Sequence, residues 1–199
     1  MLPQVVADTI GQYRFVALDV ETASSAAQSI CQVGLACVDH FGRIDTFSLL
    51  VNPRCAYSTF NTQLHGIDAR MTAGAPDFSE VLASLLPLMQ GQPIVQHSTF
   101  DQRAVNAAAR HYGLDEPPFS WVNSVTIARK AWPEWLGHGG HGLGHLKKQL
   151  ALEFQHHDAG EDARAAAQVV LLAEERLGRS LVEPLVSKAK VISPATAAQ

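Results

Sequence analysis

Cysteine is scarce in this sequence, and the few cysteines are not arranged in pairs. The 199 residues include three, Cys31, Cys37 and Cys55, and none belongs to a C-x-x-C motif. An odd number of cysteines with this spacing favours neither a disulfide framework nor a thiolate zinc site. Because free thiols persist in a reducing compartment, we expect a cytoplasmic protein.

Long apolar runs and an N-terminal basic segment are also missing. No apolar stretch approaches the roughly 18–20 residues that a helix needs to cross a bilayer. The first basic residue is Arg14, so the N-terminus lacks the charged start of a signal peptide. We therefore expect neither a membrane partner nor secretion.

Charged residues are few, and their balance is slightly negative. They make up 17% of the chain against 47% for hydrophobic residues, which is enough apolar material for one sizeable core. We expect one folded domain over residues 10–180 and a partly disordered C-terminal tail over 181–199. The net charge of −4 argues at first against a polyanionic partner such as nucleic acid.

The β-like segments predict a sheet with a central apolar strand. Residues 14–20 form a nearly continuous apolar run, which is typical of a strand buried on both faces. Residues 29–39 and 43–52 are β-like and separated by three residues, which favours an antiparallel hairpin. Residues 92–96 form a short apolar run that a turn and an alanine-rich helix follow directly. This alternation indicates an α/β fold.

Helix signals mark several later segments. Asp77 with Glu80 three residues on matches a capping box, and apolar residues then recur at helical spacing. Pro87 is expected to kink or end this helix. Three more helices are expected over residues 125–132, 143–150 and 158–177, the last capped by Asp158 and ending before Gly178.

Four acidic residues occupy positions that fit either solvent-exposed carboxylates or the ligands of a shared site. Asp19 and Glu21 lie two apart near the end of the first strand, so their side chains share one face of the sheet. Asp101 and Asp162 each fall in the first turn of a helix, where the helix dipole favours negative charge. Like charges gathered at a buried site need protons or cations to compensate them.

A histidine near the last acid supplies a possible base. His157 precedes Asp162 by five residues, and its neighbour His156 offers an alternative imidazole. Oxygen-rich carboxylate sites suit Mg²⁺ or Mn²⁺, and a neutral imidazole titrates near physiological pH. Acids and a base of this kind are the groups that metal-assisted hydrolysis requires.

Taken together, these residues resemble a known family, the DEDDh 3′–5′ exonucleases, over about residues 14–175. This family includes the proofreading epsilon subunit of DNA polymerase III, RNase T, oligoribonuclease and exonuclease X. Four short segments in the family's order carry the resemblance: Phe15-Val16-Ala17-Leu18-Asp19-Val20-Glu21-Thr22, His65-Gly66-Ile67, His97-Ser98-Thr99-Phe100-Asp101 and His157-Asp158-Ala159-Gly160-Glu161-Asp162-Ala163.

The resemblance implies a fold and a role for each of the five residues. The fold would be RNase H-like, a mixed five-stranded sheet whose first three strands form an antiparallel meander, flanked by helices. Asp19 would bridge two divalent cations, Mg²⁺ or Mn²⁺, and Glu21 and Asp162 would complete the shell of the first. Asp101 would hold the second cation or its waters, and His157 would accept the proton of the attacking water.

The resemblance also implies where the substrate lies. The segment His65, Gly66 and Ile67 would pack on the terminal nucleotide, and Thr22 and Ala23 would lie beside its sugar. Phe100 is able to stack on a base, but we favour a place in the core beneath its helix.

The sequence departs from the family pattern at two places. Ser98 stands where Asn is usual, and Asn123-Ser124 stands where many members have Asp-Thr. Because neither place supplies a metal ligand, we expect altered hydrogen bonding at the edge of the site and retained activity.

A glycine- and histidine-rich stretch over residues 137–145 is a competing metal signal. His141 and His145 lie at i and i+4, the spacing at which two imidazoles can share a zinc ion. Its five glycines make a flexible segment, so we favour a mobile loop near the substrate groove over a zinc site.

The function expected is a metal-dependent exonuclease that releases nucleoside 5′-monophosphates from single-stranded 3′ ends of DNA. Without the four acids of the site, the remaining acidic residues equal the 15 Lys and Arg, so the net charge does not exclude a phosphodiester substrate. The alternatives are an RNA-directed enzyme of the same family and a non-catalytic nucleic-acid-binding or scaffold subunit. A homodimer and a polymerase partner are both open.

Overall fold

Five strands form one mixed sheet in the computed structural model, which describes residues 13–153 and 156–182. The strand order is β3-β2-β1-β4-β5. The first three strands pair antiparallel, and β4 and β5 add to β1 in parallel, which confirms the predicted meander and its continuation. The strands are β1 (Tyr13–Thr22), β2 (Ile30–Asp39), β3 (Ile44–Leu50), β4 (Pro93–Gln96) and β5 (Ser120–Asn123).

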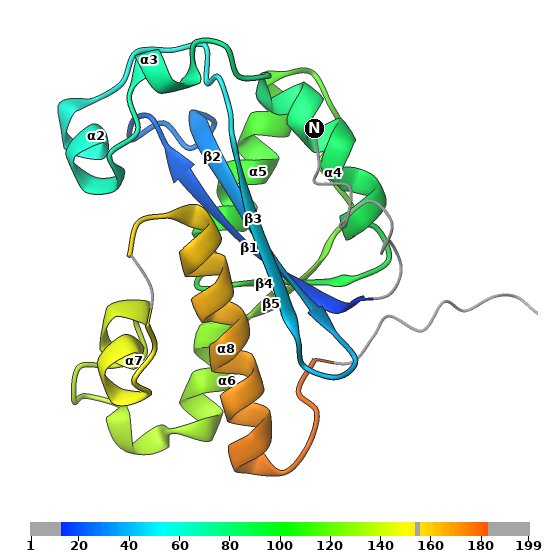
Figure 1. Ribbon diagram of the computed structural model, residues 1–199, viewed down its shortest axis with the longest axis vertical. Coiled ribbons are helices and arrows are strands. Elements are labelled where there is room, and N and C mark those ends of the chain that lie inside the picture. The colour runs from blue at the N-terminus through cyan, green and yellow to red at the C-terminus, as the bar shows by residue number, and fades with distance from the viewer. Residues whose placement is uncertain (1–12, 154–155, 183–199) are drawn as a thin grey trace, which may run out of the picture.

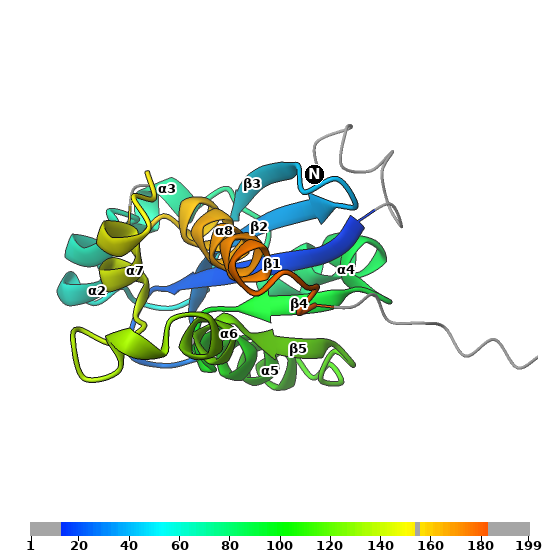
Figure 2. The same cartoon turned by 90° about the horizontal axis from the view of Figure 1, so that it is seen from below.

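Helices cover both faces of the sheet (Figures 1 and 2). One face packs against α4 (Phe78–Met89) and α5 (Phe100–His111), and the other against α6 (Ser124–Ala131), α7 (Leu143–Gln149) and α8 (Ala159–Leu177). The long helix α8 crosses β1, β2 and β3 (Figure 2). The protein is therefore a three-layer α/β structure with the sheet in the middle.

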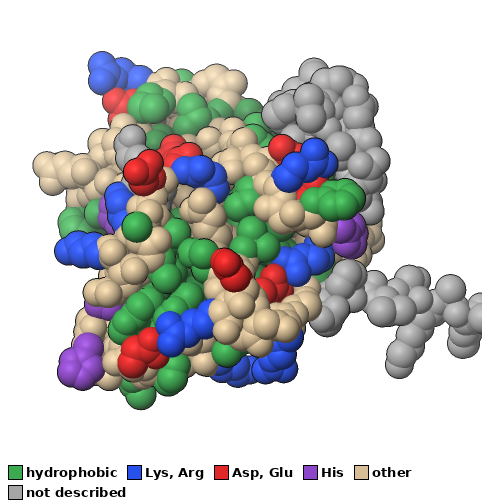
Figure 3. Space-filling view, turned by 60° about the horizontal axis from the view of Figure 1, so that its bottom comes forward, with side chains coloured by type: hydrophobic (Ala, Val, Ile, Leu, Met, Phe, Trp, Pro, Cys, Tyr) green, Lys and Arg blue, Asp and Glu red, His purple; other side chains and the backbone are tan. Residues whose placement is uncertain are grey.

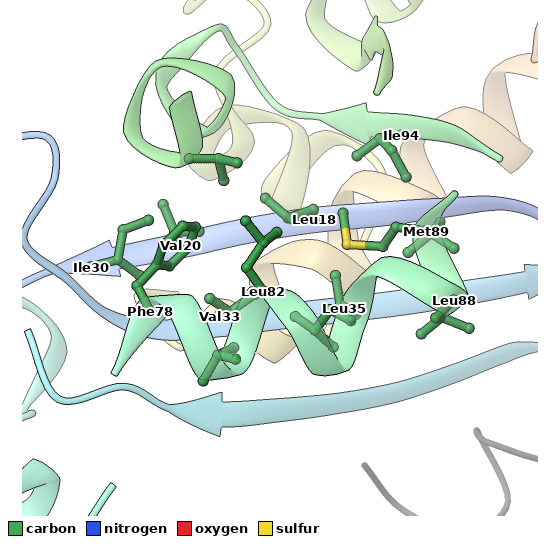
Figure 4. Packing of buried hydrophobic residues seen from close by; sticks show 14 of the residues in the cluster. Leu18, Val20, Ile30, Val33, Leu35, Phe78, Leu82, Leu88, Met89 and Ile94 are labelled. Atoms are coloured by element: carbon green, nitrogen blue, oxygen red, sulfur yellow. The ribbon is translucent and has the colours of Figure 1, made fainter. Parts of the chain in front are cut away.

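The alternation of side chains along β1 divides the core into two halves. Val16, Leu18 and Val20 point to the side of α4 and α5. Figure 4 shows Leu18 and Val20 among apolar side chains of α4, β2 and β4. Phe15 and Ala17 point to the other side, toward α8. Period-2 alternation continues this second row to residues 19 and 21, so two acids end a row of buried apolar side chains.

Small residues let α8 lie close to the sheet. The buried face of its first half is almost entirely alanine, and each of these side chains is at most 1% exposed: Ala159, Ala163, Ala165, Ala166 and Ala167. Ala17 and Ala36 on β1 and β2 belong to the same cluster. The short side chains on both sides bring the backbone of the first turn of α8 near the strand ends.

The chain between β3 and α4 is more regular than the sequence predicted. It contains α2 (Thr59–His65), with Ser58 as its cap, and α3 (Ala69–Thr72), with Asp68 as its cap. Both helices lie beyond the C-terminal end of β1 (Figure 1). These two helices were not predicted from the sequence, because they are too short to show a hydrophobic period.

One predicted detail of the helices differs from the structure. Pro87 was expected to kink or end its helix, but it does not end α4, which runs on to Met89. Leu88 and Met89 are almost fully buried, and this packing offsets the backbone hydrogen bond that proline cannot make. The Asp77 and Asp158 caps and the helix end before Gly178 are confirmed. A short 3-10 helix, η1 (Pro133–Trp135), follows α6.

The C-terminal boundary is described only in part. Leu181 and Val182, which the predicted tail includes, donate their backbone N–H groups to Glu174 of α8. Residues 183–199 lie outside the described residues. No helix among the described residues is long and apolar enough to span a membrane.

Candidate active site

Three carboxylates converge at the C-terminal end of β1. One oxygen each from Asp19, Glu21 and Asp162 lies within 4.8 Å of the other two. Two of these side chains come from β1 and the third from the first turn of α8, 141 residues further along the chain. They line a cleft of about 370 Å³ that α2 borders on its other side.

Asp101 lies directly behind this group. Its side chain is 2% exposed, and its Oδ1 accepts a hydrogen bond of 3.2 Å from the backbone N–H of Val20. Val20 separates Asp19 from Glu21 in sequence, so this bond fixes the first turn of α5 to the strand segment that carries the other acids. All four predicted acids are therefore brought to one place.

Crowding and burial raise the pKa values of the acids. Burial, helped by the carboxylates of Asp162 and Asp101, raises the pKa of Glu21 to about 7. Burial also raises the pKa of Asp101 to about 7. Burial, together with four neighbouring acids, raises the pKa of Asp19 well above its usual range. The protein alone does not compensate this negative charge, which is the condition that a bound cation relieves.

Two histidines stand at the entrance beside Asp162. His156 places Nδ1 2.8 Å from Asp162 Oδ1, while the backbone N–H of His157 donates to Asp162 Oδ2 over 2.8 Å. The two rings stack with centroids 4.1 Å apart, and both line the cleft. Burial and the neighbouring His156 lower the pKa of His157, which favours the neutral imidazole that a general base requires.

An apolar rim surrounds the opening of the cleft. Phe60 and Leu64, one turn apart on α2, and Phe100 at the start of α5 contribute to its lining. Phe60 is 72% exposed and Phe100 is 39% exposed. The prediction that Phe100 belongs to the core is wrong, because the first turn of α5 turns this side chain outward while Asp101 beside it points in.

The residues expected to bind the substrate lie in and beside the cleft, at the ends of β1 and α2. Among these five residues, Thr22 lines the cleft, whereas Ala23 and Ile67 are buried in a small cluster. Gly66 ends α2 with φ +80°, a backbone angle that glycine adopts freely.

His65 joins the end of α2 to the end of β1. Its Nδ1 accepts from the N–H of Ile67 at 3.0 Å, so Nε2 carries the proton and donates to the Thr22 carbonyl at 3.1 Å. Asn61, which sequence reasoning missed, donates to the same carbonyl over 2.8 Å. These contacts place the apolar rim of α2 over the acids of β1.

The residues that depart from the family pattern, Ser98 and Ser124 among them, make hydrogen bonds at the edge of the site. Ser98 Oγ accepts from the N–H of Phe100 and so caps the start of α5. Ser124 Oγ lies 2.8 Å from His97 Nδ1 and 3.0 Å from the carbonyl oxygen of Gln96. Burial lowers the pKa of His97 to about 4, so this ring is a neutral structural link.

The glycine- and histidine-rich stretch does not assemble a metal site within the described residues. His141 is 3% exposed, and its Nε2 lies 2.8 Å from the carbonyl oxygen of Trp132. Neither His141 nor His145 belongs to a group of three ligand side chains in residues 13–153 and 156–182. Both rings instead contact Trp135.

The donor set at the end of β1 fits a hard divalent cation. Carboxylate oxygens bound to one Mg²⁺ at about 2.1 Å lie at most about 4.2 Å apart. The spread of up to 4.8 Å among Asp19, Glu21 and Asp162 needs only small side-chain adjustments to meet that limit. Burial and neighbouring carboxylates raise the pKa values of Asp19 and Glu21, and a bound cation would offset the negative charge that causes this.

Comparison with known proteins identifies the class. The sequence model of the RNase_T exonuclease family matches residues 16–170. The chain therefore belongs to this exonuclease family, of the DEDDh type, whose members are nucleases that generally use divalent metal ions.

Two PolC-type DNA polymerases III are among the relatives in sequence. Those of Caldanaerobacter subterraneus subsp. tengcongensis and Streptococcus agalactiae serotype III are each 30% identical to the chain, over 172 and 186 residues. The matches cover 82% and 90% of this chain. They cover only 12% of each polymerase, so the similarity concerns one segment of a much longer protein.

Two solved structures share the fold. Exonuclease X in complex with 5′ overhanging duplex DNA aligns with a TM-score of 0.68 and 23% identity, covering 86% of this chain and 97% of that one. The nuclease domain of 3′hExo, a DEDDh family member bound to rAMP, aligns with a TM-score of 0.68 and 20% identity, covering 83% and 94%. These structures confirm the RNase H-like architecture expected from the sequence.

Proposed function

We propose that the protein is a metal-dependent 3′–5′ exonuclease that removes nucleoside 5′-monophosphates from single-stranded 3′ ends of DNA. The observation that carries this proposal is the convergence of Asp19, Glu21 and Asp162 on one cleft, with Asp101 behind them and a histidine pair at the entrance. Family membership and the nucleic-acid-bound structural neighbours support the same substrate class.

Each group of the site has a chemical task in this reaction. Asp19, Glu21, Asp101 and Asp162 would hold two divalent cations, Mg²⁺ or Mn²⁺, which would supply positive charge to stabilise the attacking and leaving oxygens. His157 accepts a proton from the attacking water. The water oxygen forms a bond to phosphorus, and the bond to the 3′-oxygen of the preceding nucleotide breaks. That oxygen takes up a proton from solvent water and becomes the 3′-hydroxyl end of the shortened strand.

The rim of the cleft supports a single-stranded substrate. Phe60 and Phe100 present exposed rings beside the acids, and one base stacked on an aromatic ring gains about 1–3 kcal/mol whatever its identity. Two paired strands would hold their bases against each other and away from these rings. A single 3′ end can therefore use the rim and still place its terminal phosphodiester against the carboxylates.

The charges around the cleft support distributive action. No Lys or Arg is among the described residues that line the cleft, and on the face shown in Figure 3 Lys and Arg side chains are interspersed with Asp and Glu side chains. Processive enzymes bind the phosphate backbone of the nucleic acid in a continuous positively charged groove. The affinity of such a groove for nucleic acid falls steeply as the salt concentration rises. We expect this enzyme to release its oligonucleotide between cleavages.

Labelled oligonucleotides test the polarity and the products. With a 5′ label, 3′–5′ digestion yields a ladder of shortened fragments in Mg²⁺ or Mn²⁺, and chromatography identifies the product as a 5′-monophosphate. Asp19→Asn should abolish the ladder, while Asp115→Asn, an exposed acid distant in sequence from the motifs, should leave it unchanged. Immediate release of the 5′ label as a mononucleotide would contradict the polarity.

A panel of substrates defines the preference. Because PolC-type polymerases carry the matching segment, a primer with a mismatched 3′ end belongs in the panel beside paired DNA and matched single-stranded DNA and RNA. We expect single-stranded and mismatched DNA ends to react fastest. A higher kcat/KM on RNA would reassign the enzyme to the RNA-directed branch, and binding without cleavage in Mn²⁺ would indicate a scaffold.

A further inference from the structure

Two buried glutamines lie on the two strands that flank β1. Gln32 on β2 is 7% exposed and Gln96 on β4 is 1% exposed. A buried primary amide is costly unless its oxygen and its NH₂ group find partners. Each glutamine meets that requirement at the first turn of a helix that carries one of the acids.

Gln32 joins the sheet to the start of α8. Its Oε1 accepts from the backbone N–H of Ala159 over 3.1 Å, and its Nε2 donates to Asp158 Oδ2 and to Ser48 Oγ over 3.3 Å each. An N–H group can only donate and a carboxylate can only accept, so these partners fix which way the amide faces.

The register of β1 and β2 places this contact beside the acids. Glu21 pairs with Gln32, and Asp19 pairs with Gly34. At Gly34 a side chain would meet the backbone of α8, because an added Cβ would lie 2.0 Å from the carbonyl carbon of Ala159. The first turn of α8 therefore rests on β2 directly opposite the two acids of β1.

Gln96 joins the sheet to the first turn of α5, as Gln32 joins it to the start of α8. Its Oε1 accepts from the backbone N–H of Gln102 over 2.9 Å, and its Nε2 donates to the Gln102 side chain over 3.4 Å. The residue at the cap position of α5, Thr99, makes no side-chain capping hydrogen bond. The glutamine on β4 thus supplies an acceptor to the helix turn that contains Asp101.

We propose that Gln32 and Gln96 are positioning residues of the nuclease site. Gln32 sets the distance from the Asp162 carboxylate to the acids of β1, and Gln96 does so for Asp101. Neither amide touches the substrate; each acts through the backbone of a helix. This inference rests on the proposed function, because the distances it concerns are those between cation ligands.

Replacement of the amides by an apolar side chain of similar size tests the proposal. In Gln32→Leu and Gln96→Leu we expect calorimetry without substrate to show at least tenfold weaker Mn²⁺ binding. We also expect kcat on a single-stranded oligonucleotide to fall at least tenfold, with KM within twofold of the original. Leu88→Val is the control for general destabilisation, because Figure 4 places Leu88 on α4 at the end of the sheet opposite Val20.

A charge exchange keeps the test decisive if the leucine variants do not fold. Gln32→Glu retains the acceptor for Ala159 but turns a second carboxylate oxygen toward Asp158, so Mn²⁺ binding should weaken. Adding Asp158→Asn restores a donor opposite that oxygen and should recover at least half of the lost affinity. A structural role alone would not restore Mn²⁺ binding and kcat together.

The outcomes separate the two proposals. Mn²⁺ affinity and kcat within twofold of the original protein in folded leucine variants, or no recovery in the double variant, would overturn the positioning role. An original protein that neither binds Mn²⁺ nor cleaves oligonucleotides would overturn the proposed function itself.

Discussion

Removing one charge from the acidic cleft should stabilise the protein when divalent ions are absent. The perturbation is Glu21→Gln, which preserves the size of the side chain and removes the carboxylate. Burial and the neighbouring acids Asp162 and Asp101 raise the pKa of Glu21 from its ordinary value of 4.5 to about 7. A raised pKa means that the folded state binds the proton more tightly than the unfolded state does.

The sign and size of the effect follow from this difference. The stabilisation linked to Glu21 is fully present below pH 4.5 and is lost as the pH rises through about 7. At about 1.36 kcal/mol per pH unit, roughly 2.5 units correspond to about 3 kcal/mol. At pH 8 without divalent ions, Glu21→Gln should therefore raise the free energy of unfolding by up to about 3 kcal/mol, and at pH 4 by almost nothing.

Urea unfolding followed by circular dichroism measures this free energy at both pH values in a chelator. Glu175→Gln, an exposed carboxyl of α8, is the matched control and should change stability by less than about 0.5 kcal/mol. Saturating Mn²⁺ at about 100 times the dissociation constant adds about 2.7 kcal/mol to the original protein, and Glu21→Gln should gain less. A Glu21→Gln protein that is less stable than the original at pH 8 in chelator would refute the reasoning.

Three further predictions concern stability, chemistry and substrate contact. Glu174→Ala breaks the ion pair with Arg14 and frees two backbone N–H groups, so urea unfolding should show a loss of about 3 kcal/mol; a loss below about 1 would contradict this. His157→Ala should lower kcat by about 10²- to 10⁴-fold, which is the range for a lost general base. If His156→Ala showed this loss of kcat and His157→Ala stayed active, His156 would be the base instead. Phe60→Ala should raise KM for a single-stranded oligonucleotide by about 5- to 100-fold at constant kcat, because a stacked base gains about 1–3 kcal/mol; steady-state kinetics showing a fall in kcat alone would oppose it.

The elements with strong local signals were predictable from the sequence. The apolar run around Leu18 gave the central strand, and the Asp77 and Asp158 caps gave the starts of two helices. The pairing of Asp19 with Glu21 on one face follows from the period of a strand. That Asp101 and Asp162 join them depends on strand order, which only the family resemblance supplied.

Contacts between distant segments left no trace in the local pattern. The hydrogen bonds of Gln32 to Asp158 and Ala159 join residues more than 120 positions apart, and a glutamine within a strand carries no local mark of such a partner. Phe60 and Phe100 are exposed because a cleft opens beside them, and apolar periodicity assigns such residues to a core. Short helices such as α2 escape detection for the reason given above.

The order in which the acids occur along the chain has a consequence for biosynthesis. Asp19 and Glu21 leave the ribosome first, whereas the turn that carries Asp162 follows 141 residues after Glu21. A nascent chain that has not yet docked α8 lacks Asp162 and one wall of its cleft, so the cluster of carboxylates is complete only after α8 has been made.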